Sequence, residues 1–266
     1  MNILLTRYLD LSAFILKIIA MISMTFDHTG YIIFGGVSFF NYIGRLAFPI
    51  FAFQIAQGYI HTKNFKKYLS RLAIFAFISQ IPFMLFRYAA SNTMVSIPEI
   101  PSTIYNAIIA LDFTLNIFFT LTIGLIAIWA YDKIKYKFAG LLVGISLAYL
   151  AEFISTDYGF YGVAIILLFY IFKDSKILMP VSFTIATIAF YIHRIYPIYV
   201  DYYIKKVIDI SLYLNREILL CFFTIVPIFF ISLYNGKKGR NTKYLLYLFY
   251  PIHLLLIYLS YLFLHN

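Results

Sequence analysis

The sequence is poor in charged residues and nearly lacks cysteine. Asp, Glu, Lys and Arg make up 12% of its 266 residues, about half the share in a typical soluble domain. The one cysteine, Cys221, excludes an internal disulfide framework and a cysteine-based metal cluster, and no metal site is predicted. The sequence also lacks HExxH, GxSxG and dinucleotide-binding motifs.

Internal repeats, low-complexity tails and Gly/Ser linkers are missing as well. The lack of two related halves argues against a transporter built from inverted repeats. The lack of a linker argues against a second domain. We therefore predict a single transmembrane domain over residues 1–266.

Apolar residues replace the missing charge, because 63% of the chain is hydrophobic and 21% aromatic. A stretch of about 17 to 25 apolar residues can cross a hydrocarbon core about 30 Å thick. The sequence predicts an all-α fold, a polytopic transmembrane helix bundle of about nine helices in a cell membrane. The predicted helices begin near Leu11, Phe39, Tyr68, Ile108, Phe138, Tyr158, Ile177, Glu217 and Tyr244.

The net charge of +10 is explained by membrane topology. The basic residues form no exposed platform interleaved with aromatic rings, so nucleic acid is not a predicted partner. They lie in short loops, and the positive-inside rule places the N-terminus in the cytoplasm and the C-terminus outside. We expect the first helix to remain as an anchor. The predicted cytoplasmic loops hold Lys63, Lys66, Lys67, Arg71, Lys133, Lys135, Lys137, Lys173, Lys176, Lys237, Lys238, Arg240 and Lys243, and the external ones hold Arg87, Arg194, Lys205, Lys206 and Arg216.

Two adjacent ionisable residues, Asp27 and His28, interrupt the first apolar run. A charge at the centre of a membrane helix costs about 2.5 kcal/mol or more, so such residues commonly serve chemistry or transport. Lys17 precedes His28 by eleven residues, which places both on one helix face about 16 Å apart along the axis. His28 can act as a general base near neutral pH; the alternative is a helix-packing role.

Asp27 lies about 100° around the helix from His28 and needs another partner. Arg45 on the second helix has a matching depth, and a buried guanidinium requires a carboxylate or phosphate. Structural and catalytic roles are both open for this predicted pair. His253, near the middle of the last helix, can either orient a substrate or complete a hydrogen-bond network.

Other polar positions have structural and functional interpretations. Asn116, with Asp112 one turn earlier, is expected in the outer half of the fourth helix, either lining a cavity with His28 or joining helices. Asp157 is expected to cap a helix. The external connections 89–106 and 194–215 are expected to be an irregular loop and an amphipathic stretch at the membrane interface. In the turn 234–240, Lys237, Lys238 and Arg240 either cradle a phosphate or only set topology.

Seven segments together resemble the TraX family, whose founding members are associated with N-terminal acetylation of conjugative pilin. The resemblance extends to a wider group of membrane acyltransferases, the acyltransferase-3 proteins and the lysosomal heparan acetyltransferases. The matching segments are 27–31 (DHTGY), 43–53 (IGRLAFPIFAF), 71–83, 116–121 (NIFFTL), 157–159 (DYG), 235–239 (NGKKG) and 250–254 (YPIHL).

The resemblance implies acyl-CoA, in particular acetyl-CoA, as the donor. In acyltransferase-3 proteins a basic residue precedes an essential His by eleven positions, as Lys17 precedes His28 here. By this resemblance, Lys17 and the turn with Lys237, Lys238 and Arg240 would hold the CoA phosphates while the thioester reaches His28. The chain lacks the larger size and periplasmic acceptor domain of those proteins, so the acceptor is not defined.

The predicted function is a membrane O- or N-acetyltransferase that carries an acyl group to the outer side. His28 would be the base, with His253 as the second candidate for that role. Asp27 and Arg45 would shape the site, and Arg45 or Asn116 would stabilise the oxyanion. The predicted partners are acyl-CoA, the lipid bilayer and a glycan, lipid or peptide (pilin N-terminus) acceptor; self-association is left open. The alternatives are a proton-coupled transporter or flippase, and a non-catalytic assembly factor for a pilus or other surface structure.

Overall fold

The computed structural model describes residues 10–34, 38–91, 114–205, 210–240 and 244–264, and nearly all of them are helical. Two pairs of helices follow end to end, α3 with α4 and α11 with α12, so the eleven helices make nine passes. This confirms the predicted all-α bundle. The helices are α2 (Ala13–Phe34), α3 (Phe39–Gly44), α4 (Ala47–His61), α5 (Phe65–Ser91), α7 (Ile117–Lys133), α8 (Lys137–Phe153), α9 (Gly159–Ile171), α10 (Leu178–Lys205), α11 (Ile210–Ile225), α12 (Pro227–Ser232) and α13 (Leu245–Leu264).

Six of the passes are long and apolar enough to cross a membrane: Ala13–Ile33, Phe39–His61, Phe65–Ala90, Leu178–Val200, Tyr213–Ser232 and Leu245–Leu264. The pass predicted near Tyr158 is shorter, because α9 has only 13 residues. Most of its side chains are buried among α4, α7, α8 and α10. A helix enclosed by other helices does not have to match the thickness of the hydrocarbon core by itself.

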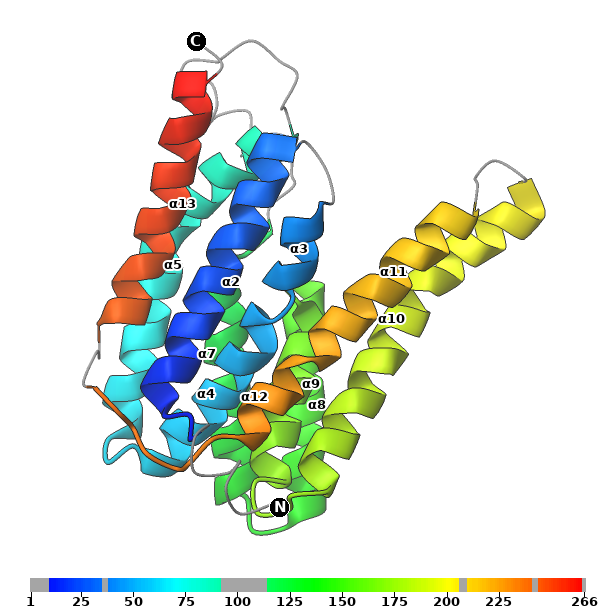
Figure 1. The fold of residues 1–266 in the computed structure, drawn as a ribbon. Helices are drawn as coiled ribbons and strands as arrows, with labels where there is room; N and C mark the ends of the chain where they lie inside the picture. The colour runs from blue at the N-terminus through cyan, green and yellow to red at the C-terminus, as the bar shows by residue number, and fades with distance from the viewer. Residues whose placement is uncertain (1–9, 35–37, 92–113, 206–209, 241–243, 265–266) are drawn as a thin grey trace, which may run out of the picture.

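The successive passes run in alternating directions, and the first and last described helices, α2 and α13, lie side by side (Figure 1). The start of α2 and the end of α13 lie at opposite ends of the bundle (Figure 1). We call the end with the lysine-rich loops 63–67, 133–137, 173–176 and 237–240 the inner end, and the opposite one the outer end. This arrangement fits the predicted topology.

The segment 194–215, predicted to lie along the membrane interface, is helical on both sides of residues 206–209, which lie outside the described residues. The helix α10 continues without a break to Lys205, with Pro197 inside it, and α11 begins at Ile210. The helix α11 packs along α10, and the hairpin of α10 and α11 leans away from the other helices toward the outer end (Figure 1). The predicted loop 89–106 begins later, since α5 reaches Ser91, and the rest lies outside the described residues.

A carboxylate joins three helices at the inner end. The Tyr59 hydroxyl on α4 donates to Asp132 Oδ2 at 2.8 Å, and the Tyr170 hydroxyl on α9 donates to Oδ1 at 2.7 Å. Lys133 Nζ lies 3.0 Å from Oδ2. Asp132 is in the last turn of α7, so these bonds connect α4, α7 and α9 where the bundle closes.

Removing one of these hydroxyls is expected to lower stability. A hydrogen bond to a charged group contributes about 1.5 to 3 kcal/mol, so Tyr170→Phe should reduce the free energy of unfolding by roughly that amount. Thermal unfolding in detergent measures the effect. Tyr136→Phe is the matched control, because the Tyr136 side chain is 71% exposed. Equal melting temperatures for the two variants would contradict the role given to Asp132.

Candidate functional site

The second pass changes its backbone hydrogen bonding at Arg45. The amides of Arg45 and Leu46 bond to the carbonyls of Tyr42 and Ile43 at 3.2 and 3.1 Å, an i to i+3 pattern between α3 and α4. Such short 3₁₀ segments inside a pass often mark functional positions. A Cβ on the preceding Gly44 would overlap the Asp27 side chain, so only glycine lets α3 approach α2 this closely. The break therefore brings Arg45 to α2, where a single straight helix was expected.

Asp27 and Arg45 form the predicted ion pair. Arg45 Nη2 lies 2.6 Å from Asp27 Oδ1, and Arg45 Nε donates to the Asn41 carbonyl at 3.3 Å. Asn41 Nδ2 donates to the Asp27 carbonyl at 2.9 Å and to Oδ1 at 3.3 Å. Asn41 is fully buried and links the two helices through both residues. The pair is thus held by a third side chain that the sequence did not single out.

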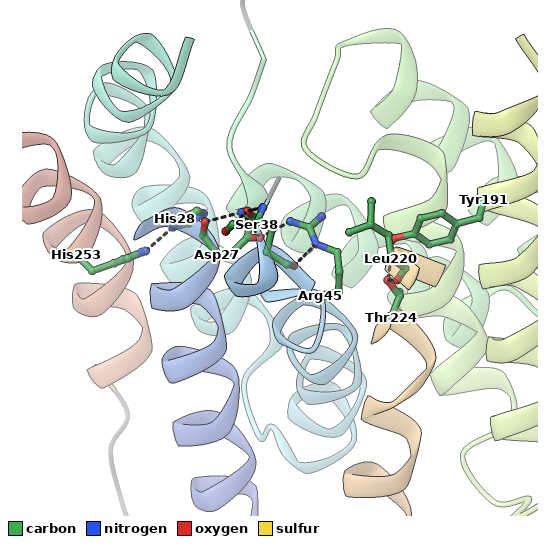
Figure 2. A network of polar contacts seen from close by, with 9 residues as sticks. Asp27, His28, Ser38, Arg45, Tyr191, Leu220, Thr224 and His253 are labelled. Atoms are coloured by element: carbon green, nitrogen blue, oxygen red, sulfur yellow. Dashed lines mark hydrogen bonds and ion pairs between the residues drawn. The ribbon is translucent and has the colours of Figure 1, made fainter. Parts of the chain in front are cut away.

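His28 pairs with His253, which lies 225 residues further along the chain. His28 Nδ1 and His253 Nε2 are 2.8 Å apart (Figure 2). His253 Nδ1 lies 2.9 Å from the Phe249 carbonyl. A carbonyl only accepts hydrogen bonds, so His253 Nδ1 carries hydrogen and its Nε2 is an acceptor when the ring is neutral. His28 Nδ1 must then be the donor. This chain of bonds assigns His28 the tautomer with an unprotonated Nε2, the nitrogen that a general base needs.

A cavity of about 520 Å³ lies at the outer end beside these residues. It is formed where α2, α4, α5, α10, the Arg45 break and the turn before α9 meet, and we call it the outer cavity. Its polar lining is Asp27, His28, Tyr31, Arg45, Arg87, Asp157, Tyr158, Tyr191, Arg194 and Tyr250, and its other lining residues include Met24, Phe48, Phe51, Phe83, Phe86 and Phe190.

A second cavity of about 550 Å³ lies at the inner end, and we call it the inner cavity. Its lining includes Lys17, Gln54, Gln57, His61, Arg71, Lys238 and Tyr247. Phe51, which is 4% exposed, lines both cavities. The two predicted ends of the Lys17 to His28 face on α2 therefore open into two different cavities that share one aromatic wall.

Only part of the predicted basic turn reaches the inner cavity. Gly236 and Lys238 line it, whereas Lys237 and Arg240 do not. The carbonyls of Lys237 and Lys238 accept from the amides of Ala13 and Phe14 at 2.9 and 3.1 Å, which satisfies free donors of the first turn of α2. The backbone of this turn is therefore a helix cap, and any anion contact would come from the side chains.

Asp157 lies in the outer cavity, and the prediction that it caps a helix is wrong. The N-cap of α9 is Tyr158, whose φ of 63° is unusual for a residue with a side chain. Leu115 fixes this turn: its amide donates to the Ser155 carbonyl at 2.9 Å, and its carbonyl accepts from the Asp157 amide at 2.8 Å. The Thr120 hydroxyl also donates to the Asp157 carbonyl. Backbone strain held by such contacts is common at functional sites.

Burial raises the pKa of the Asp157 carboxyl to about 6, against the opposing fields of Arg45 and Arg87. Its protonation state therefore changes near neutral pH, unlike that of an ordinary aspartate. The Tyr158 ring stacks on Phe48 with the centroids 3.8 Å apart. Sequence reasoning treated this segment as a helix cap and a family motif, because nothing in its spacing shows that the turn points into a cavity.

Asn116 does not line the outer cavity with His28, its predicted neighbour. It is the N-cap of α7 and accepts from the Phe118 amide at 3.0 Å. Its Nδ2 donates to the Ala76 carbonyl at 2.7 Å and to Gln80 Oε1 at 2.8 Å on α5. The side chain is fully buried and is not part of the outer cavity lining, so the geometry favours the helix-joining role. Asp112 lies outside the described residues.

Comparison with known proteins assigns the chain to a family. The model of the TraX protein family matches residues 12–260. The probable fimbrial assembly protein FimC, serogroup H1, of Dichelobacter nodosus is 28% identical over 271 residues, covering 95% of this chain and 97% of that protein. No solved structure matches the chain. The family match begins one residue before α2 and ends within α13, so it takes in all nine passes, and the chain belongs to the TraX family.

Proposed function

We propose that the protein takes part in the assembly or modification of a bacterial surface filament and that it does so by acyl transfer through the membrane. The first half of the proposal rests on the relative named as a fimbrial assembly protein. The second rests on one observation in the structure: a histidine with an unprotonated Nε2 lines the outer cavity, and a basic cavity lies across Phe51 from it.

The donor in this proposal is acetyl-CoA, entering from the inner end. Lys17, Arg71 and Lys238 line the inner cavity and suit its phosphate groups. The helix rise from Lys17 to His28 is about 16 Å, a distance that the extended pantetheine arm matches. The arm reaches the outer cavity only if the Phe51 side chain moves aside, since this residue lines both cavities.

The reaction joins the acceptor to the acyl carbon. The lone pair of an acceptor hydroxyl or amine attacks the thioester carbonyl carbon, and His28 Nε2 takes the proton that the acceptor loses. Arg45 lines the same cavity and can stabilise the negative charge that develops on the carbonyl oxygen. The carbon–sulfur bond then breaks, and the CoA thiolate leaves and takes the proton back from His28, which restores the base. His253 holds the imidazole of His28 in the required tautomer.

Transfer of label tests the proposal. Membrane vesicles containing the protein would receive acetyl-CoA labelled in the acetyl group at the inner face. Label should then appear in a protein, glycan or lipid fraction only when the wild-type chain is present. Absence of labelled product, together with normal filament assembly by the His28→Ala variant, would favour a non-catalytic assembly factor, the function that the relative's name supports directly. Movement of an unmodified solute would favour the transporter alternative.

Lys17 is expected to act on donor binding alone. Because Lys17 lines the inner cavity and not the outer one, Lys17→Gln should raise the KM for acetyl-CoA and leave kcat unchanged. Loss of one charge-assisted contact predicts a change of about tenfold or more. Lys66→Gln is the control, since Lys66 is exposed at the same end of the bundle. A fall in kcat without a change in KM would contradict this role.

A further inference from the structure

The outer cavity is lined by arginine although it lies at the end of the bundle where positive charge is disfavoured. Arg45, Arg87 and Arg194 reach it from the α3–α4 break, α5 and α10. The positive-inside rule selects against basic residues outside the membrane. Membrane topology therefore does not explain why these guanidinium groups are present. Arg45 and Arg194 are each paired with an acidic residue that does not use all of their N–H groups.

Arg194 is held so that most of its donors stay open. Its Nη2 donates to Glu217 Oε1 at 3.1 Å, which is its one hydrogen bond among the described residues. Glu217 is 1% exposed, whereas the Arg194 side chain is 37% exposed. The guanidinium lies over the rings of Phe190 and Tyr191, 5.8 and 5.5 Å from their centroids. The buried carboxylate thus positions one nitrogen, and the remaining N–H groups are available to the cavity.

The ring beneath Arg194 is itself fixed. The hydroxyls of Tyr191 and Thr224 are 2.9 Å apart, and Thr224 donates to the Leu220 carbonyl at 2.7 Å (Figure 2). This joins the middle of α10 to the last turn of α11. A guanidinium positioned by a buried acid and a fixed aromatic ring loses little conformational freedom when it binds a ligand.

The donors in the cavity favour an anion. Glu217 balances the charge of Arg194 but bonds to one nitrogen only, and the carboxylate of Asp27 is already bonded to Arg45. Asp157 is the other acid of the lining, and burial raises its pKa to about 6, so it loses its negative charge as the pH falls below neutral. The Tyr158 and Tyr191 rings add flat walls. We propose that Arg194 recognises an oxyanion group, a carboxylate or a phosphate, on the acceptor that enters the outer cavity.

The identification of the anion as part of the acceptor rests on the proposed acyl transfer. The anion site itself follows from the geometry. Phenylglyoxal, which modifies arginine, can measure its occupancy in the intact protein in phosphatidylcholine nanodiscs, with peptide mass spectrometry to follow each residue. Inorganic phosphate or acetate should slow the modification of Arg194 relative to that of the exposed Arg240. In a calorimetric titration with phosphate, the Arg194→Lys variant should bind about tenfold to a hundredfold more weakly than the wild type, since a lysine cannot form the two-pronged contact.

The protection experiment distinguishes a soluble anion from a lipid headgroup. Combined with the label-transfer assay, it also tests the anion site and the acyl transfer separately. Protection by soluble phosphate supports a soluble acceptor group, and protection by phosphatidylglycerol nanodiscs without phosphate supports a lipid headgroup. If neither protects Arg194, the inference is overturned. Lys17→Gln should leave the protection unchanged, because Lys17 lines only the inner cavity. Protection without acetyl transfer would leave the anion site standing and reject the proposed function, whereas transfer without protection would reject the anion site alone.

Discussion

Replacing His28 with alanine is expected to lower the rate of acetyl transfer about 10²- to 10⁴-fold, the usual contribution of a positioned general base. The variant removes the Nε2 atom of His28, the nitrogen of that ring that the hydrogen bonds to His253 and Phe249 leave unprotonated. The rate of label transfer from acetyl-CoA in vesicles measures the effect. The His193→Ala variant is the matched control, because His193 is exposed on α10 and is not part of either cavity lining.

The contact with His253 allows a finer test. His253→Gln keeps an acceptor that can face His28 Nδ1, whereas His253→Leu removes it. The Gln variant should therefore retain much more activity than the Leu variant if His253 acts by setting the tautomer of His28. Equal rates for both, or an unchanged rate for His28→Ala, would reject the base assignment.

The Asp27→Asn and Arg45→Gln variants are each expected to lower the free energy of unfolding by about 3 to 5 kcal/mol, because each leaves a buried charge without its partner. The two groups are 2.6 Å apart with side chains only 13% and 14% exposed. The double variant should be more stable than the sum of the single losses predicts, since it leaves no unpaired charge. Thermal unfolding in detergent of the four proteins measures the coupling.

An exposed ion pair serves as the reference for this comparison of the wild type, the two single variants and the double variant. Lys173 and Asp174 are 3.4 Å apart, and the Asp174 side chain is 89% exposed. Exposed ion pairs contribute about 0 to 1 kcal/mol, so Asp174→Asn should change stability little. If Asp27→Asn is as stable as Asp174→Asn but transfers no label, the pair is catalytic and not structural.

Prediction from the sequence succeeded for features that depend only on position along the chain, namely the helix passes and the depth of residues along them. Each apolar run must cross the bilayer, so the run lengths gave the number of passes and nearly all of their starting points, from Leu11 near α2 to Tyr244 at α13. Depth along a helix also follows from residue number, and this was enough to pair Asp27 with Arg45. The length of α9 and the continuation of α10 to Lys205 were missed, because helix neighbours decided both.

The composition and the lengths of the apolar runs by themselves determined an all-helical bundle, with nine passes among the described residues, and a costly polar pair, Asp27 and His28, within its first helix. Only the tertiary structure decided which groups meet that pair. The contact of His28 with His253 spans 225 residues, and the strained turn at Tyr158 turns Asp157 toward the same cavity. Helix rotation and the crossing of distant segments set these contacts, and neither has a period or a spacing that a single sequence records.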